Sequence, residues 1–306
     1  MRSGLVIGTS GAFGAVAADA RRAEQLGFDL VASGEHLFFH GPTSNAFITL
    51  AAAAGATERI RLLSALTILP LYPMAMAAKM ASALDLISNG RFGLGVGVGG
   101  EYPPEFAAVG AAVAGRGRRT DEALGVMVRL LSGERVTAEG PFGSLQDLRL
   151  EPPPVQRPHP PIWVGGRRTP AMRRAGRFGD VWMPYMVSPG SFARSLAGAR
   201  VFAEQAGRPA TALTGALFVW GSVDDDRVRA RREAVEFVSG VYHQDFEPLA
   251  DRYLLHGDPD AVTARLTEYH AAGVETVIFS PACPPERHAD VTALFARAVC
   301  PHLPAA

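Results

Sequence analysis

The sequence contains little that would tie it to a metal, a nucleic acid or a membrane. Only two cysteines, Cys283 and Cys300, occur in 306 residues, and their separation matches neither a metal-ligand nor a redox spacing. Basic and acidic residues are equal in number, 30 each, so the chain lacks the excess positive charge with which proteins bind nucleic acid or anionic lipid. No uninterrupted apolar run reaches about 18 residues, the length of a membrane-spanning helix.

Sequence signatures of several enzyme classes are absent as well. The zinc-binding patterns HxxxH and HExxH do not occur, and neither does the GxSxG pattern of serine hydrolases. The first ten residues, MRSGLVIGTS, lack the apolar stretch of a secretory signal peptide and have the character of a strand. Two unpaired thiols suit a reducing compartment. We therefore expect a cytoplasmic protein with no metal site and with a small molecule as its ligand.

Short apolar runs alternate with amphipathic stretches along the whole chain. Helix stop and start signals punctuate this alternation: Gly27 and the pair Asn89-Gly90 are typical of helix C-termini, and the pair Asp258-Pro259 is typical of an N-terminus. We expect strands at residues 5–10, 30–33, 60–69, 92–98, 162–165, 181–184, 213–219 and 276–280. Between and after them we expect helices ending near Gly27 and at residues 47–57, 73–87, 121–131, 171–178, 191–206, 224–241, 259–269 and 289–299.

Eight strands that alternate with helices predict a single (β/α)₈ TIM barrel over residues 1–306. A doubly wound open sheet has the same local alternation, but the count of eight strands and the chain length favour the closed barrel. The alternation fails at residues 133–161, where many prolines occur, because proline continues neither a helix nor a central strand. We expect a Pro-rich, irregular insertion there, between strands 4 and 5.

In a parallel barrel the reactive groups follow the C-terminal ends of the strands. This rule selects four segments: Glu35-His36, Ser64-Ala65, the run from Gly95 to Tyr102, and the run from Gly165 to Thr169. Glycine alternates with valine in the third segment, which lacks the context of a dinucleotide-binding fingerprint. Its small residues either leave the barrel open for a planar ring or relieve crowding inside it.

Two kinds of chemistry are suggested by these segments. Gly165 and Gly166 lead into a helix whose N-terminus favours anions, and Arg167 and Thr169 add hydrogen-bond donors, so we expect a phosphate site rather than an ordinary turn. His36 and Glu101 follow strands and are candidates for proton transfer. The alternatives are a structural histidine and a plain loop carboxylate. We place His40, His159 and His243 on the surface or in loops.

Taken in order, these segments resemble the luciferase-like monooxygenase family, which includes deazaflavin-dependent reductases. The matching text is AEQLGFD at 23–29, EH at 35–36, ATERIR at 56–61, AK at 78–79, LDLISNGRF at 84–92, LGVG at 94–97, RTDE at 119–122, PIWVGG at 161–166, GDVW at 179–182 and GDP at 257–259. The resemblance implies a barrel, often dimeric, that binds FMN or coenzyme F-420. It further implies a bulge in the third strand, with a non-proline cis peptide at Ser64–Ala65 against which the cofactor ring rests.

The resemblance also assigns site residues. It implies His36 and Glu101 as catalytic groups, although the sequence around Glu101 departs from the family pattern. The residues implied for cofactor binding are Glu35, His36, Ser64, Ala65, Gly97, Val98, Gly99, Gly165, Gly166, Arg167 and Thr169. Family members commonly carry serine in the phosphate-binding turn, where this chain has Arg167-Arg168.

Three functions are compatible with this resemblance. The first is hydride transfer between coenzyme F-420 and a small organic substrate, favoured because Lys79 is the single lysine and the composition is that of a high-GC genome, of the kind found in actinobacteria that make the coenzyme. The second is an FMN-dependent monooxygenase that receives reduced flavin from a separate flavin reductase. The third is a barrel that binds flavin without catalysis. The cofactor decides between the first two, because the deazaflavin transfers hydride and avoids the oxygen chemistry of FMN.

Overall fold

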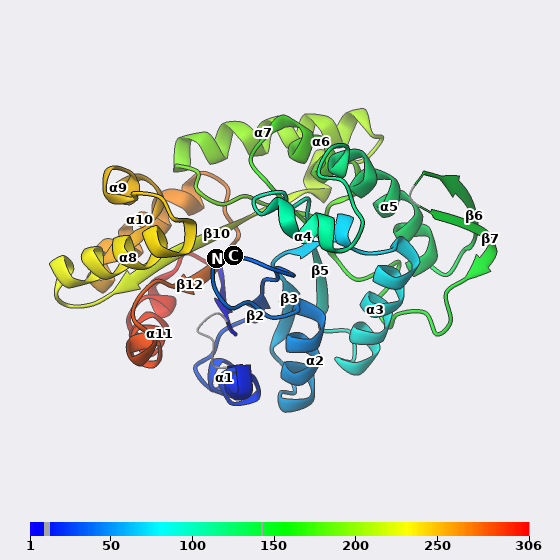
Figure 1. Ribbon diagram of the computed structural model, residues 1–306. Helices are drawn as coiled ribbons and strands as arrows, with labels where there is room; N and C mark the ends of the chain where they lie inside the picture. Colours follow the sequence, from blue (N-terminus) through cyan, green and yellow to red (C-terminus); the bar gives the residue numbers. More distant parts are fainter. Residues whose placement is uncertain (9–12, 142, 306) are drawn as a thin grey trace.

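The computed structural model describes residues 1–8, 13–141 and 143–305, and in these residues eight parallel strands close into a barrel (Figure 1). β1 pairs with both β2 and β12, and β9 pairs with β10, so the ring of strands is continuous. The barrel strands are β1 (Arg2–Val6), β2 (Leu30–Ser33), β3 (Arg61–Ser64), β5 (Phe92–Gly97), β8 (Ile162–Gly165), β9 (Val181–Met183), β10 (Thr214–Val223) and β12 (Thr276–Pro281). The predicted eight-stranded barrel is confirmed.

Three strands differ most from the expected ones. One of them, β10, extends to Val223, past the expected end at residue 219. The first expected strand, residues 5–10, corresponds to the end of β1, and its residues 9–10 lie outside the described residues. The third expected strand, residues 60–69, is broken into β3 and the two-residue β4 (Thr67–Ile68), which pairs with β5. A short strand that we did not predict, β11 (Leu255–Gly257), pairs with β10 outside the ring.

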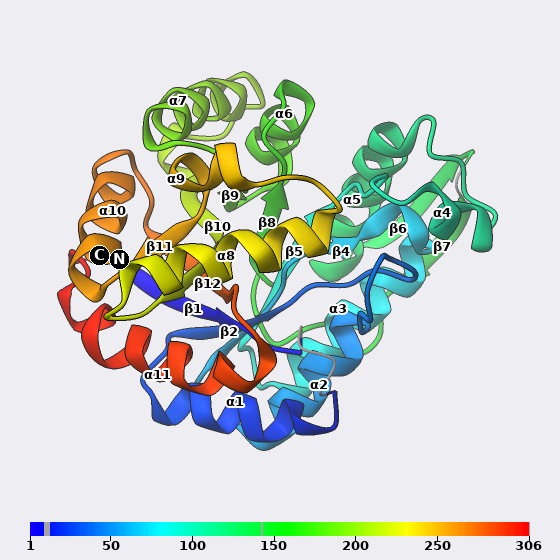
Figure 2. The ribbon, with the colours of Figure 1, turned by 60° about the vertical axis from the view of Figure 1, so that its left-hand side comes forward.

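Helices surround the barrel, as the β/α alternation predicted (Figures 1 and 2). They are α1 (Val16–Gln25), α2 (Ala46–Ala56), α3 (Met74–Ile87), α4 (Pro103–Ala108), α5 (Arg116–Leu131), α6 (Thr169–Phe178), α7 (Pro189–Gln205), α8 (Arg227–Tyr242), α9 (Ala250–Tyr253), α10 (Pro259–Ala271) and α11 (His288–Ala298). The two chain ends lie side by side in both views, and the Met1 ammonium donates a hydrogen bond to the Pro304 carbonyl. Among the described helices none is long and apolar enough to cross a membrane.

Local signals in the sequence account for several helix ends. Residues Asn89 and Gly90 adopt positive φ after α3, and Gly27 does so after α1, which is the backbone conformation that ends helices. The Asp258 side chain accepts a hydrogen bond from the Ala261 N–H at the start of α10, with Pro259 in the first turn. These three predicted boundaries are confirmed.

The core has two layers, one inside the barrel and one between the barrel and the helices. Side chains alternate between the two faces of each strand, so every second residue points into the barrel. The interior residues are Val6, Leu30, Ala32, Leu63, Trp163, Val181, Met183, Ala216 and Ile278. The larger outer cluster includes Leu50, Leu62, Leu124, Phe192, Phe279 and Phe295. These side chains fill the barrel interior below the C-terminal ends of its strands, and the space at those ends is left for a ligand.

The segment 133–161 is not irregular throughout, so that part of our expectation is wrong. It begins with an antiparallel hairpin, β6 (Arg135–Gly140) and β7 (Gly143–Arg149), which projects from the barrel in both views. The prolines are concentrated after the hairpin, at residues 152–161, and therefore do not interrupt its hydrogen bonds. α8 has a highly charged sequence, and it also has a buried face that includes Ala230, Ala234 and Val238.

Candidate functional site

A cavity of about 690 Å³ lies at the C-terminal ends of the barrel strands. Loops after β1, β2, β3, β5, β8 and β9 contribute to it, as do β10 and the C-terminal part of α8. Of the predicted site residues, the cavity is lined by Glu35, His36, Ala65, Gly97, Val98, Gly99, Glu101, Gly165, Gly166 and Arg167. Ser64 and Thr169 are not among the residues that line it. The strand-end rule thus brought most of the selected segments into one place.

Glycines line the side of the cavity formed by the first five barrel strands. We call Gly8, Gly34, Gly97, Gly165 and the Ala65–Leu66 peptide the glycine half. A Cβ atom at Gly34 would lie 3.0 Å from the Ala65 carbonyl oxygen, and one at Gly165 would lie 2.0 Å from Leu66 Cδ1. A side chain at Gly34 would press on the Ala65 carbonyl, and one at Gly165 would collide with the Leu66 side chain, so glycine lets these strands approach the bent third strand closely.

The third strand contains a cis peptide, one residue later than expected. The bond is Ala65–Leu66 rather than Ser64–Ala65. Ser64 is fully buried, and its Oγ hydrogen-bonds to the backbone of Gly95, donating to the carbonyl oxygen at 3.0 Å and accepting from the N–H at 2.9 Å. Ser64 therefore joins β3 to β5 behind the cavity and is held away from a ligand.

His36 is positioned by a residue that we did not predict. Its Nδ1 lies 3.2 Å from Oε2 of Glu105, whose side chain is fully buried and also accepts a hydrogen bond from the Leu37 N–H. The His36 ring stacks on Phe39 with a centroid distance of 4.1 Å. A carboxylate at Nδ1 orients the imidazole and leaves Nε2 for another partner. Glu105 belongs to the short helix α4, for which the Pro103-Pro104 start was the available signal.

Glu35 lines the cavity, but its carboxylate is occupied by the protein itself. It accepts hydrogen bonds from the Ile68 and Ala46 N–H groups and from the side chains of Asn45 and Tyr72. Burial raises the pKa of Glu35, and these hydrogen bonds oppose the increase. Glu35 thus ties β2 to β4 and to the start of α2, which supports the adjacent His36.

Glu101 also lines the cavity, and it pairs with a tyrosine that we did not predict. The Tyr185 hydroxyl donates to Glu101 Oε1 at 2.6 Å, and the guanidinium of Arg167 lies over the Tyr185 ring at 5.3 Å. Burial, reinforced by the neighbouring Glu101 charge, raises the pKa of Tyr185, which stays a neutral donor. One carboxylate oxygen is therefore held in place by the protein.

Aromatic side chains line the remaining side of the cavity. We call Tyr185, Phe218, Trp220, Phe237 and Tyr242 the aromatic half. Trp220 meets Phe218 edge-to-face and Phe237 at a tilt, each at 5.6 Å between centroids, and its Nε1 donates to the Tyr242 hydroxyl at 3.4 Å. Burial raises the pKa of Tyr242 to about 12. His40, which we placed in a loop, also contributes to the lining.

The turn after β8 presents positive charge and backbone donors. Gly166 has a φ of +106°, a conformation that side chains rarely adopt, and it leads through Arg167 and Arg168 into α6. The N-terminus of α6 receives no hydrogen bond from a capping side chain. Arg167 and Arg168 line the cavity, whereas Thr169 is exposed and forms the first residue of the helix. The turn can therefore hold an anionic group through backbone N–H groups and two arginines.

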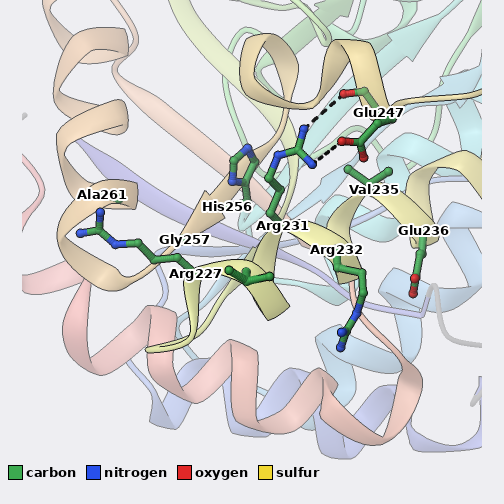
Figure 3. A pocket seen from close by; sticks show the side chains of 10 residues that line it. Arg227, Arg231, Arg232, Val235, Glu236, Glu247, His256, Gly257 and Ala261 are labelled. Carbon is green, nitrogen blue, oxygen red and sulfur yellow. Dashed lines mark hydrogen bonds and ion pairs between the residues drawn. The ribbon is translucent and has the colours of Figure 1, made fainter.

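A second cavity, of about 610 Å³, lies on the other side of α8 (Figure 3). Its most central charge, Arg231, points at Glu247 in Figure 3 and bonds to it at 2.6 Å and to Asp251 at 3.2 Å. Paired charges of this kind need no ligand. In the part of the chain that the structure describes, no group of three or more potential metal ligands occurs. The barrel mouth is therefore the candidate site.

The sequence of the chain is similar to those of known proteins. The profile of the luciferase-like monooxygenase family matches residues 2–276. An uncharacterized protein of Mycobacterium tuberculosis is 33% identical over 176 residues, 57% of this chain and 60% of that protein. The 4-hydroxyprotoasukamycin monooxygenase of Streptomyces nodosus subsp. asukaensis is 36% identical over 169 residues, 54% of this chain and 45% of that enzyme. These alignments cover less than two thirds of the relatives' length.

Solved structures match the whole chain. The monooxygenase RslO1 from Streptomyces bottropensis superposes with a TM-score of 0.87 and 26% identity, covering 99% of both chains. An F420-dependent secondary alcohol dehydrogenase, in complex with an F420-acetone adduct, gives a TM-score of 0.86 at 20% identity over 99% of both chains. The oxygenating constituent of 3,6-diketocamphane monooxygenase from Pseudomonas putida, in complex with FMN, gives 0.80 at 21% identity over 100% of both chains.

Proposed function

The chain belongs to the luciferase-like monooxygenase family, and from that premise we propose that it transfers hydride between coenzyme F-420 and a small organic substrate. It is an oxidoreductase or monooxygenase of this family, whose structural neighbours include both F420-dependent and FMN-dependent members. The observation that carries the proposal is the pair His36–Glu105 at the cavity, with 3.2 Å between Nδ1 and Oε2. Hydride transfer to or from a carbon–oxygen bond requires a group that moves a proton at the oxygen.

The residues of the cavity fit a flavin-type cofactor. The glycine half lines the cavity with backbone and with glycines that have no side chain, and we assign the flat ring of the cofactor to this side. The turn at Arg167 and Arg168 would hold a phosphate-bearing tail at the N-terminus of α6. The two features are parts of one lining, as a ligand with a flat ring and an anionic tail requires.

Each site residue has a separate task in this proposal. When bound, the deazaflavin supplies the carbon that gives or accepts hydride. His36 donates or accepts the proton at the substrate oxygen, and Glu105 holds the imidazole in the orientation that leaves Nε2 available. Glu101, fixed by Tyr185, contacts the substrate. The aromatic half keeps water away from the reacting groups.

A cofactor titration tests the proposal directly. Purified protein is titrated with oxidised coenzyme F-420 and, separately, with oxidised FMN, and quenching of cofactor fluorescence is followed. We expect micromolar binding of F-420 and weaker binding of FMN. If folded protein does not bind F-420, the proposed hydride transfer is excluded. Oxygenation is excluded only if the protein also binds neither oxidised nor reduced FMN.

A second candidate is an FMN-dependent monooxygenase. The comparisons support it as well as the first candidate, because the FMN-bound oxygenating constituent of 3,6-diketocamphane monooxygenase is 21% identical to this chain and the F420-dependent dehydrogenase is 20% identical. Such an enzyme would take reduced FMN from a separate flavin reductase. Oxygen consumption during turnover separates the two candidates, because the deazaflavin reaction consumes none.

We further propose that the protein is a homodimer that buries the outer faces of α2 and α3. These helices pack side by side, and most of their large outward residues are apolar: Ile48 is 69% exposed, Met76 57% and Ile87 59%, with Lys79 as the charged exception on α3. Exposed apolar stripes of this kind mark association surfaces. Light scattering on the wild type should give twice the 32.4 kDa chain mass, and Ile48→Glu should reduce it to one chain. A monomeric wild type would exclude the dimer.

A further inference from the structure

Resting on the proposed function, we infer that the substrate is a hydroxylated aromatic compound, whose ring packs against the aromatic half and whose hydroxyl group donates a hydrogen bond to Glu101. The two halves of the cavity are chemically different, and the proposed function assigns the cofactor ring to the glycine half. The aromatic half and the Glu101–Tyr185 pair are then free to select the second ligand.

The aromatic half offers an unusual density of ring surface. Phe218 and Trp220 come from neighbouring inward positions of β10, and Phe237 and Tyr242 come from α8. Their rings are held by one another and by the Trp220–Tyr242 hydrogen bond, so they present a preorganised wall. Aromatic pairs gain about 0.5–1.5 kcal/mol beyond the burial of their area. A planar aromatic ligand is therefore favoured over an aliphatic ligand of equal size.

Glu101 defines the polar part of the ligand. Its Oε1 accepts from Tyr185, and Oε2 has no hydrogen-bond partner among the described residues. An ionised carboxylate only accepts hydrogen bonds, so the matching ligand group is a donor. The positive charge of Arg167, stacked on the Tyr185 ring, disfavours an ammonium group at the same place. A neutral hydroxyl group fits both conditions.

The test compares three probes that differ in one property each. Calorimetry measures the binding of 2-naphthol, 2-methoxynaphthalene and decahydro-2-naphthol to protein saturated with F-420 or FMN and to protein without cofactor. The methoxy compound removes the donor, and the saturated compound removes the aromatic rings. We expect 2-naphthol to bind about tenfold more tightly than 2-methoxynaphthalene, which corresponds to one charge-assisted hydrogen bond. We expect a smaller preference, about fivefold, over the saturated alcohol.

Two variants assign these preferences to residues. In Glu101→Ala the preference for 2-naphthol over its methyl ether should disappear, whereas in Glu139→Ala, which removes an exposed carboxylate of the β6–β7 hairpin, it should persist. In Trp220→Leu the preference for the aromatic over the saturated alcohol should disappear and the preference over the methyl ether should persist. Circular dichroism and thermal melting confirm that each variant is folded.

Three results would overturn the inference: equal binding of 2-naphthol and its methyl ether, an unchanged preference in Glu101→Ala, or stoichiometric displacement of the cofactor by 2-naphthol. The last result would mean that the aromatic half is the site of the cofactor ring. Failure of the proposed function is seen separately, in the cofactor titration. If the protein binds no cofactor but still distinguishes the probes through Glu101, the aromatic binding site is supported and the proposed redox reaction is excluded.

Discussion

The glycine half and the aromatic half of the cavity are built on the same barrel by different means. In the glycine half, backbone atoms approach so closely that side chains are excluded: a Cβ at Gly95, directly behind it, would lie 1.8 Å from the Ser64 carbonyl oxygen. In the aromatic half, large side chains of β10 and α8 pack on one another. The first arrangement admits few substitutions, and the second allows exchange of one ring for another apolar group. The residues that select the substrate can therefore change while the cofactor side of the cavity stays the same.

The aromatic half depends on how α8 is attached to the barrel. Asp224 follows β10, and its carboxylate bonds to Arg229 of α8 at 2.6 Å and to Arg287 before α11. Asp226 caps the helix by accepting from the Val228 and Arg229 N–H groups. A cluster of charges thus holds one end of α8, and Phe237 and Tyr242 lie toward the other end.

The largest effect is expected from a substitution that disrupts the backbone contacts behind the glycine half. Gly95→Val should destabilise the protein by roughly 3 kcal/mol or prevent its folding, because the new side chain collides with the backbone of the third strand. Urea unfolding measures the change. The matched control is Gly125→Ala in α5, where nothing lies within 4 Å of the added Cβ, and it should be neutral or stabilising. Unfolding of Gly95→Val at the wild-type urea concentration would disprove the close approach.

The second prediction concerns the proton-handling pair. His36→Ala should lower kcat by about 10²-fold. Glu105→Gln should lower it in the same direction, since Glu105 acts by orienting His36. The kcat of the double variant should then be no lower than that of His36→Ala alone. If the two residues acted independently, the two fold-losses in kcat would multiply.

Turnover is followed at the cofactor absorbance band, and cofactor affinity is measured in parallel. That affinity should change little in either single variant. Glu139→Gln serves as the matched carboxylate control. A double variant whose loss is the product of the single losses would argue against the pair.

The third prediction concerns Asp224, whose ion pairs attach α8 and thereby the aromatic half to the barrel. Burial opposes ionisation of Asp224, but hydrogen bonds from Arg229 and Arg287 lower its pKa from the usual 3.8 of an aspartate to about 2. A lowered pKa means that the ionised group stabilises the fold above pH 3.8, and that this contribution is lost as the pH falls through about 2. Asp224→Asn should therefore cost about 2 kcal/mol at neutral pH.

Urea unfolding from pH 7 down to pH 2 checks this prediction. The difference between wild type and Asp224→Asn should shrink as the pH falls below 3.8. Asp225→Asn, at the exposed neighbouring position, should match the wild type at every pH. A difference that stays constant with pH would show that ionisation of Asp224 does not stabilise the fold.

The smallest expected effects come from comparing one variant in each half of the cavity. Phe237→Leu keeps an apolar group and should change stability by less than about 1.5 kcal/mol, with cofactor affinity unchanged. Gly97→Ala adds one carbon beside Leu66 and should weaken cofactor binding by about tenfold. Cofactor titration of the two variants measures the contrast. Equal affinities would mean that the glycine half does not contact the cofactor.

The barrel and the location of its site were predictable, because they depend on local patterns. Eight apolar runs separated by amphipathic stretches predicted the strands, and the strand-end rule selected His36, Glu101 and the turn at Gly165. Helix ends at Gly27 and Asn89-Gly90 followed from backbone preferences that each residue carries by itself.

Features that depend on contacts between distant residues were missed or misplaced. Glu105 is 69 residues from His36 along the chain, and no spacing rule connects them. Tyr185 and Glu101 are 84 residues apart. Ser64 and Thr169 were selected because they follow or start the right elements, but neither lines the cavity. For the same reason the cis peptide was predicted one residue too early, at Ser64–Ala65 instead of Ala65–Leu66.

The sequence by itself determined the alternation of strands and helices, their approximate ends, and the loops in which the chemistry lies. Periodicity, glycine, proline and capping residues act within a few positions of the chain, so they can be interpreted without a structure. Only the tertiary structure decided which side chains face the cavity, that Glu35 is bonded by the protein while Glu105 orients His36, and that the mouth has a glycine half and an aromatic half. Closure of the barrel brings residues far apart in the chain within hydrogen-bonding distance, and side-chain direction there is set by packing rather than by local preference.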